Sequence, residues 1–147
     1  MRNRVEVMHG VNLDQLGRRD PLTYGGMSFD ALELRIERQA RELGLQPRFF
    51  HTNHEGEFVE HLHRLEGLAD AVVLNPGAWT HYSYAIRDAV EFAGVPAVEV
   101  HLSDVHARED FRRVSVFDGL EARIGVVTGK GPDGYREALE LVRAELA

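Results

Sequence analysis

The 147-residue chain contains no cysteine, so it has neither a disulfide framework nor a thiolate metal site. No apolar run approaches the length of a membrane span, and residues 1–7 lack the apolar stretch of a signal peptide. We therefore expect a cytoplasmic protein that does not insert into a membrane.

Basic residues are fewer than acidic ones: 17 Lys and Arg against 24 Asp and Glu give a formal net charge of −7. Binding to a nucleic-acid duplex depends largely on neutralising phosphates, so this balance argues against nucleic acid as the main partner. It still permits a small anionic ligand, because a local cluster of Arg can lie in an acidic protein. The length and the hydrophobic fraction of 44% predict a single globular domain over residues 1–147.

Short apolar runs alternate along the chain with amphipathic helical patterns. The runs that predict buried strands lie at residues 5–8, 48–51, 71–74, 95–98 and 124–128. Between them, apolar residues recur at helical spacing, with Ser28 as the expected N-cap of the first helix and Thr80 as that of the third. This order predicts an α/β fold, a flavodoxin-like doubly wound sheet of five parallel strands.

The longest stretch with neither pattern is residues 9–27, directly after the first predicted strand. Irregular segments of this length inside a compact domain are usually functional or disordered. This one contains Arg18, Arg19 and Tyr24, and we predict that it is a lid over a ligand crevice. A cation such as Arg19 next to Tyr24 would stabilise the phenolate, which can serve as a base.

Charged and hydroxyl side chains gather in residues 99–113, where the fourth predicted strand should end. In open α/β sheets, ligands bind outside the carboxyl ends of the strands. The segment offers an imidazole for proton transfer, a hydroxyl for orientation and guanidinium groups for a carboxylate, on His101, Ser103, His106, Arg108 and Arg112. Further polar residues follow other predicted strands, at Asn12, 52–54, Asn75 and His81.

Each of these residues has a plainer explanation when it is taken alone. A single His at a strand end, such as His101, is about as often a surface residue, and Tyr24 alone is more often a packing aromatic. Asn75 before a proline can simply end a strand. Several polar strand ends at one edge of a parallel sheet favour a binding site, here one for a small anionic, hydroxylated substrate.

The motifs that carry a specific resemblance run from Gly10-Val11-Asn12-Leu13 to Gly134-Tyr135, nearly the whole chain. Between these ends lie 16–21, Tyr24-Gly25, 53–57, 75–81, 87–89 and, above all, 99–112. In them the sequence resembles the type II 3-dehydroquinate dehydratases (type II dehydroquinases). The resemblance implies a hydro-lyase of the shikimate pathway that converts 3-dehydroquinate into 3-dehydroshikimate and water. It also implies a homo-oligomer, a dodecamer built as a tetramer of trimers, with no metal or organic cofactor.

The resemblance implies a role for each matching residue. Tyr24, as phenolate, would remove the proton alpha to the ketone, and Arg19 would stabilise that phenolate. Asn12 would hold a water that stabilises the enolate. His101, oriented by Glu99, would protonate the departing hydroxyl. The substrate's carboxylate and ring hydroxyls would contact Asn75, His81, Leu102, Ser103 and Arg112, and a neighbouring subunit would contribute Asp88.

The sequence also departs from the family pattern. Val11, Asp20, Asp104 and Val114 stand where the family usually has Pro, Glu, Asn and His. Asp104 would add negative charge beside the expected carboxylate site, and residues 116–123 diverge and are about two residues longer than is typical. Two other functions stay open: a non-catalytic homologue that binds a related polyol acid, and a flavin or nucleotide carrier, which rests on the fold alone.

Overall fold

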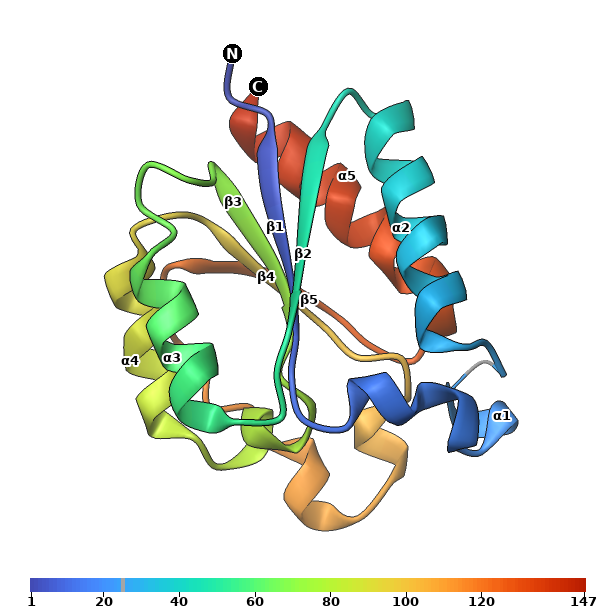
Figure 1. Cartoon of the computed structure of the whole chain (residues 1–147). Helices are drawn as coiled ribbons and strands as arrows, with labels where there is room; N and C mark the ends of the chain where they lie inside the picture. The colour runs from blue at the N-terminus through green and yellow to red at the C-terminus, as the bar shows by residue number, and fades with distance from the viewer. Residues whose placement is uncertain (25) are drawn as a thin grey trace.

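The computed structural model describes residues 1–24 and 26–147, so Gly25, within the predicted lid, lies outside the described residues. Five parallel strands form one sheet in the order β2-β1-β3-β4-β5 (Figure 1). They are β1 Arg4–His9, β2 Gln46–His51, β3 Ala71–Asn75, β4 Ala97–Val100 and β5 Arg123–Val127. The predicted flavodoxin-like α/β sheet is therefore confirmed.

Four longer helices cover the two faces of the sheet. Helices α2 and α5 pack on one face, and α3 and α4 pack on the other (Figure 1). Their bounds are α2 Phe29–Glu42, α3 Glu55–His63, α4 Tyr84–Ala93 and α5 Gly134–Leu146. Both described termini lie at one end of the sheet, and the strands run from there to the opposite end, where the connecting loops gather.

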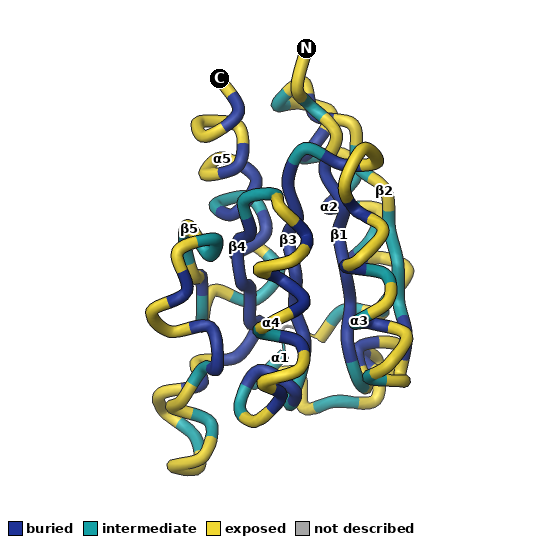
Figure 2. The backbone as a smooth tube through the Cα atoms, turned by 90° about the vertical axis from the view of Figure 1, so that its left-hand side faces the viewer, coloured by how far each residue is buried: buried dark blue, intermediate teal, exposed yellow. Residues whose placement is uncertain are grey.

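The core consists of the two layers between the sheet and its helices. Along β1, Val5 and Val7 face α2 and α5, whereas Met8 faces α3 and α4, because successive strand side chains point to opposite faces. Every residue of β3 and β4 is buried, which fits the apolar runs that mark strands covered on both faces (Figure 2). Pairing on both sides holds these strand ends rigidly.

One predicted helix start is wrong. The N-cap of α2 is Ser28, as expected, since its side chain accepts a hydrogen bond from the Ala31 amide at 3.1 Å. Helix α4, however, is capped by Ser83, which accepts from the Ile86 amide at 3.1 Å, and not by Thr80. The Thr80 hydroxyl donates instead to the buried carboxylate of Glu99 at 2.7 Å. A tertiary partner outweighs the local preference for a cap here.

Two connections are built from short helices. The predicted irregular segment 9–27 begins with the last residue of β1 and then contains a three-ten helix, η1 Leu13–Arg18, and one turn of helix, α1 Pro21–Tyr24. The crossover from β4 to β5 uses the three-ten helices η3 Val105–Ala107 and η4 Asp110–Arg113 in place of an α-helix. The remaining short helices are η2 Gly77–His81 and η5 Gly131–Asp133.

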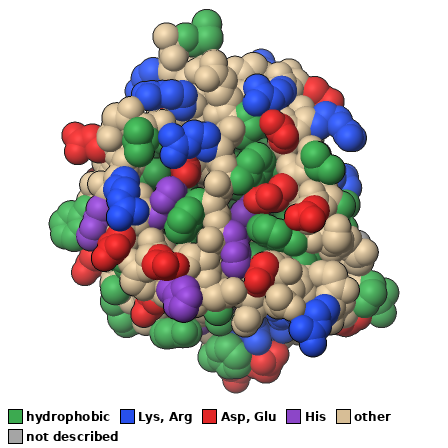
Figure 3. All heavy atoms as spheres, viewed as in Figure 1, with side chains coloured by type: hydrophobic (Ala, Val, Ile, Leu, Met, Phe, Trp, Pro, Cys, Tyr) green, Lys and Arg blue, Asp and Glu red, His purple; other side chains and the backbone are tan. Residues whose placement is uncertain are grey.

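The surface carries both signs of charge. On the face shown in Figure 3, acidic and basic side chains are interspersed, with histidines among them. Within the described part of the chain, no helix combines the length and the apolar character needed to span a bilayer.

Candidate active site

The cavity that corresponds to the predicted site lies at the carboxyl end of the sheet, beside the strand-order reversal between β1 and β3. The loops after these strands meet through their backbones, and the Gly10 amide donates to the Asn75 carbonyl oxygen at 2.7 Å. A Cβ at Gly10 would lie 2.4 Å from the Pro76 carbonyl oxygen, and one at Gly77 would lie 2.6 Å from that of Val11. Both positions therefore require glycine.

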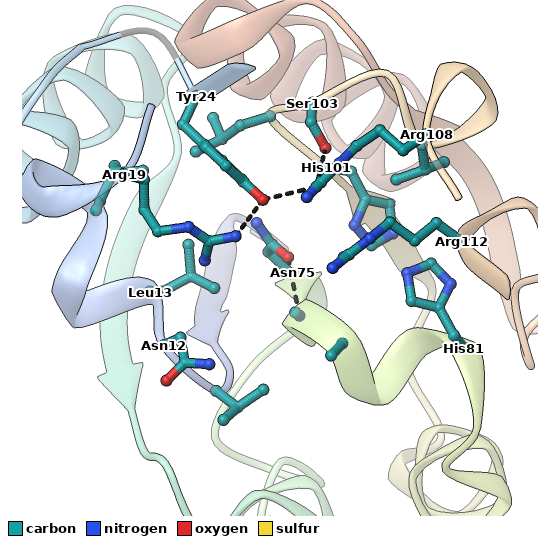
Figure 4. Close-up of a pocket in the computed structure, with 16 residues that line it drawn as sticks. Asn12, Leu13, Arg19, Tyr24, Asn75, His81, His101, Ser103, Arg108 and Arg112 are labelled. Carbon is teal, nitrogen blue, oxygen red and sulfur yellow. Dashed lines mark hydrogen bonds between the residues drawn. The ribbon is translucent and has the colours of Figure 1, made fainter. Parts of the chain in front are cut away.

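Nine of the ten site residues predicted from the sequence line this cavity. They are Asn12, Arg19, Tyr24, Asn75, His81, His101, Leu102, Ser103 and Arg112, all labelled in Figure 4 except Leu102. The tenth, Asp88, is exposed on α4 and lies outside the cavity of its own chain, so its role in a neighbouring subunit stays a prediction. His106, expected at the same edge, is also exposed and lines a smaller neighbouring cavity instead of this one.

The Tyr24 hydroxyl lies between two guanidinium groups (Figure 4). It accepts hydrogen bonds from Arg19 Nη2 and, at 2.6 Å, from Arg108 Nη1. The Cζ atoms of Arg19 and Arg108 lie 4.0 and 5.3 Å from the centre of the Tyr24 ring. Arg19 follows η1 and Arg108 follows η3, so the two loops converge on one phenol oxygen.

His101 follows β4 directly and is only 6% exposed. Its Nε2 lies 2.6 Å from Oε2 of Glu99, which leaves Nδ1 as the ring nitrogen available to a ligand. Burial alone would raise the pKa of Glu99, but hydrogen bonds from His101, Arg123 and Thr80 hold that pKa at about 2. Glu99 is therefore a fixed anion that orients the His101 ring.

His81 and Asn75 also line the cavity, and each has a polar side-chain atom available to a ligand. His81 Nδ1 lies 2.8 Å from the Val114 carbonyl oxygen, so this nitrogen carries the proton and Nε2 is an acceptor. Burial lowers the pKa of His81, which keeps the ring neutral. The Asn75 Oδ1 accepts from the Gly77 amide at 3.0 Å, which leaves the Nδ2 amide group of Asn75 as its donor. Together they offer an acceptor and a donor to a hydroxylated ligand.

The positive charge of the cavity comes from three guanidinium groups. Arg112 lies beside His81 (Figure 4). Its Nε is 3.2 Å from a Glu109 carboxylate oxygen. Its terminal nitrogens make no hydrogen bond to the part of the chain that the structure describes, which suits them to pair with a carboxylate. Arg108 Nη1 also donates to the Ser103 hydroxyl at 3.2 Å. This set of groups suits an anion that carries hydroxyl groups.

Asp104 does not place its charge in this cavity. Its Oδ1 accepts a hydrogen bond from the His106 amide at 3.1 Å, which caps η3, and the residue is absent from the cavity lining. The side chain therefore serves the fold of the loop and does not face the anion site. Across residues 1–24 and 26–147, no group of three His, Cys, Asp or Glu side chains could hold a metal ion.

Sequence reasoning gave no specific role to two arginines that the structure brings to the site. Arg108 lay in the segment predicted to be functional, but its contact with Tyr24 spans 84 residues of sequence. Arg123 lies in the divergent segment and carried no signal at all, yet its Nη1 is 2.7 Å from Oε1 of Glu99. Only the folded chain could reveal these two contacts.

Comparison with known proteins identifies the family. The dehydroquinase class II family model matches residues 3–143. The 3-dehydroquinate dehydratase of Thermotoga neapolitana is 50% identical over 137 residues, 93% of this chain and 92% of that protein. The crystal structure of type II dehydroquinase from Propionibacterium acnes covers 98% of both chains, with a TM-score of 0.90 and 37% identity. The chain therefore belongs to the dehydroquinase class II family, and it is an enzyme of the lyase class.

Proposed function

We propose that this chain converts 3-dehydroquinate into 3-dehydroshikimate and water by anti elimination through an enolate. The observation that carries the proposal is the placement of Tyr24 and His101 on one cavity. The tyrosine oxygen there accepts from two cations, and the histidine is paired with a buried carboxylate. This arrangement separates a base from an acid, as elimination of water requires.

Tyr24 is the proposed base. Arg19 and Arg108 both donate to its oxygen, and a nearby positive charge favours the phenolate over the phenol. The phenolate takes the proton from the carbon between the ketone and the carbon that bears the departing hydroxyl. The electron pair moves onto the ketone oxygen, and a water held at Asn12 stabilises the resulting enolate.

His101 is the proposed acid. The enolate collapses to form the new carbon–carbon double bond, the bond to the hydroxyl breaks, and His101 supplies the proton that makes the leaving group water. Glu99 balances the imidazolium charge before this transfer and fixes the ring plane. The products are a conjugated enone and one water molecule, so atoms and charge balance.

The remaining lining residues hold the substrate. Arg112 and the backbone of Leu102 and Ser103 suit the carboxylate, with the Ser103 hydroxyl as a further donor. The His81 Nε2 and the Asn75 side chain suit the ring hydroxyls. This assignment makes substrate affinity depend on Arg112 and turnover depend on Tyr24 and His101.

We also propose the homo-oligomer, a dodecamer of four trimers, and a cytoplasmic role in the shikimate pathway toward aromatic amino acids. The exposed side of α4 supports an assembly. Tyr84, Asp88 and Phe92 are spaced by four residues and share one helix face, where Tyr84 is 70% and Phe92 is 68% exposed. Exposed aromatics on either side of a carboxylate fit a covered interface that would bring Asp88 to a neighbouring site.

The test is a spectrophotometric assay with 3-dehydroquinate, with and without a metal chelator. We expect the enone absorbance to rise at the same rate in both conditions. Binding of 3-dehydroquinate without turnover would support the alternative, a non-catalytic homologue that binds a polyol acid. Sedimentation of the purified protein measures the assembly, and a stable monomer would contradict the proposed dodecamer.

A further inference from the structure

We infer that Arg123 is a positioning residue for the reaction: it keeps Glu99 paired after His101 has given up its proton. The inference rests on the proposed function, in which His101 is the acid. It assigns a task to the segment 116–123, which differs from the usual family pattern and contributes no residue to the catalytic cavity.

The strand register explains how Arg123 reaches Glu99. Arg123 opens β5 and lies opposite Ala97, and an irregularity between Ala97 and Val98 shifts the pairing, so that Val98 lies opposite Gly125. Ala97 and Glu99 are two residues apart, so their side chains emerge on the same face of the sheet. A long side chain opposite Ala97 can therefore extend diagonally to Glu99.

The Glu99 carboxylate is buried and makes several short polar contacts. Its side chain is 1% exposed and that of Arg123 is 15% exposed. Arg123 Nη1 lies 2.7 Å from Oε1 of Glu99, and the Ser115 hydroxyl donates to the same oxygen at 2.9 Å. Arg123 Nη2 lies 3.0 Å from the carboxylate of Asp118, which anchors the far side of the guanidinium.

Other charged and titratable groups surround this pair. On the cavity side, the His81 and His101 rings stack with centres 6.3 Å apart, and Arg112 lies beside them. On the outer side, a small cavity between η4 and β5 is lined by His106, Arg113 and Asp118. Among these groups, Arg123 is the cation in direct contact with Glu99 besides the His101 ring.

Charge balance gives Arg123 its role. Before proton transfer, Glu99 lies between two cations, the His101 imidazolium and the Arg123 guanidinium. After transfer, a neutral Glu99–Arg123 pair remains. Without Arg123, proton transfer would leave a buried carboxylate with no cationic partner, which is strongly unfavourable. Arg123 therefore makes His101 a readier proton donor, although it does not touch the substrate.

The test compares Arg123→Gln with the wild type in steady-state assays on 3-dehydroquinate from pH 5 to about pH 10. We expect kcat to fall about 10-fold or more, with KM within about 2-fold, since the substrate contacts are intact. The alkaline limb of the kcat profile, where the acid loses its proton, should move up by about 1 pH unit. Arg123→Lys keeps the charge and should stay near the wild type.

Two controls separate this role from a loss of folding or of the proposed function. Arg4→Gln breaks a more exposed arginine–carboxylate pair, Arg4 with Asp70, at the start of β1 and outside the catalytic cavity, and should leave the alkaline limb in place. The inference would be overturned if the alkaline limb of the kcat profile did not move in Arg123→Gln, or if it moved equally in Arg4→Gln. A wild type without turnover counts against the proposed function instead. In that case, NMR titration of the His101 ring still tests the role of Arg123. The titration midpoint should rise in Arg123→Gln, and an unchanged midpoint would refute that role.

Discussion

The proposed base and the proposed acid are held in opposite ways. Tyr24 lies at the end of α1, a single helical turn with no buried residue, and the side chains of Arg19 and Arg108 hold its oxygen. His101 continues a fully buried strand, and the Glu99 carboxylate that orients it accepts hydrogen bonds from several buried or half-buried partners. Segments with few buried contacts open locally at low cost. We therefore expect the base side to open more readily than the acid side.

The largest expected effect is on turnover, when either reacting group is removed. Tyr24→Phe and His101→Ala should each lower kcat by about 1,000-fold, within the range for loss of general acid–base catalysis. The enone absorbance measures this loss. The contrast between the two regions predicts a second difference: Tyr24→Phe should leave the melting temperature unchanged, and His101→Ala should lower it. Equal melting temperatures in the two variants would contradict the claim that the region around His101 is the more rigid one.

Removing the charge of Glu99 should have the next largest effect, this time on stability. Glu99→Gln leaves the Arg123 guanidinium without its buried partner, and breaking such a pair typically costs about 3 kcal/mol of unfolding free energy. Arg19→Gln, on the Tyr24 side, should cost less than about 1 kcal/mol, because its contact with Tyr24 is only part-buried and solvent screens it. Urea unfolding measures both variants. Similar losses of unfolding free energy in Glu99→Gln and Arg19→Gln would contradict the difference in rigidity between the two regions.

Low pH should destabilise the region around His101, because Glu99 becomes protonated there. The pKa of Glu99 is held at about 2 in the folded chain, below its ordinary value of 4.5. A lowered folded-state pKa contributes stability that is complete above pH 4.5 and is lost as the pH falls toward 2. The free-energy difference between the wild type and Glu99→Gln should therefore shrink from pH 6 to about pH 3. The comparison is needed because Asp70, paired with Arg4, also has a pKa of about 2.

The smallest effect is expected at Asp104, between the two regions. Its carboxylate caps η3 and does not line the cavity. Asn is an equally good cap, so Asp104→Asn should change KM and kcat by less than about 2-fold and stability by less than about 0.5 kcal/mol. A several-fold fall in KM would show instead that the Asp104 charge repels the substrate.

The sequence predicted the sheet and most of the cavity because local patterns encode them. Buried strands such as β3 appear as apolar runs, and polar residues at their ends, such as Asn75 and His101, fall at the predicted edge. The sequence patterns did not predict features that depend on tertiary contacts. The Thr80 hydroxyl binds Glu99 and does not cap a helix, and Arg123 reaches Glu99 only through an irregular strand register. Asp88 lies outside the cavity of its own chain, so its predicted role depends on a contact between subunits.

Isotope exchange tests the central claim most directly, namely that proton removal and hydroxyl protonation belong to separate regions. The variants Tyr24→Phe and His101→Ala would be incubated with 3-dehydroquinate in deuterium oxide, and the recovered substrate examined by NMR. His101→Ala should incorporate deuterium next to the ketone without forming product, because Tyr24 still makes the enolate. Tyr24→Phe should show neither exchange nor product. Exchange in Tyr24→Phe and none in His101→Ala would contradict the assignment of base and acid.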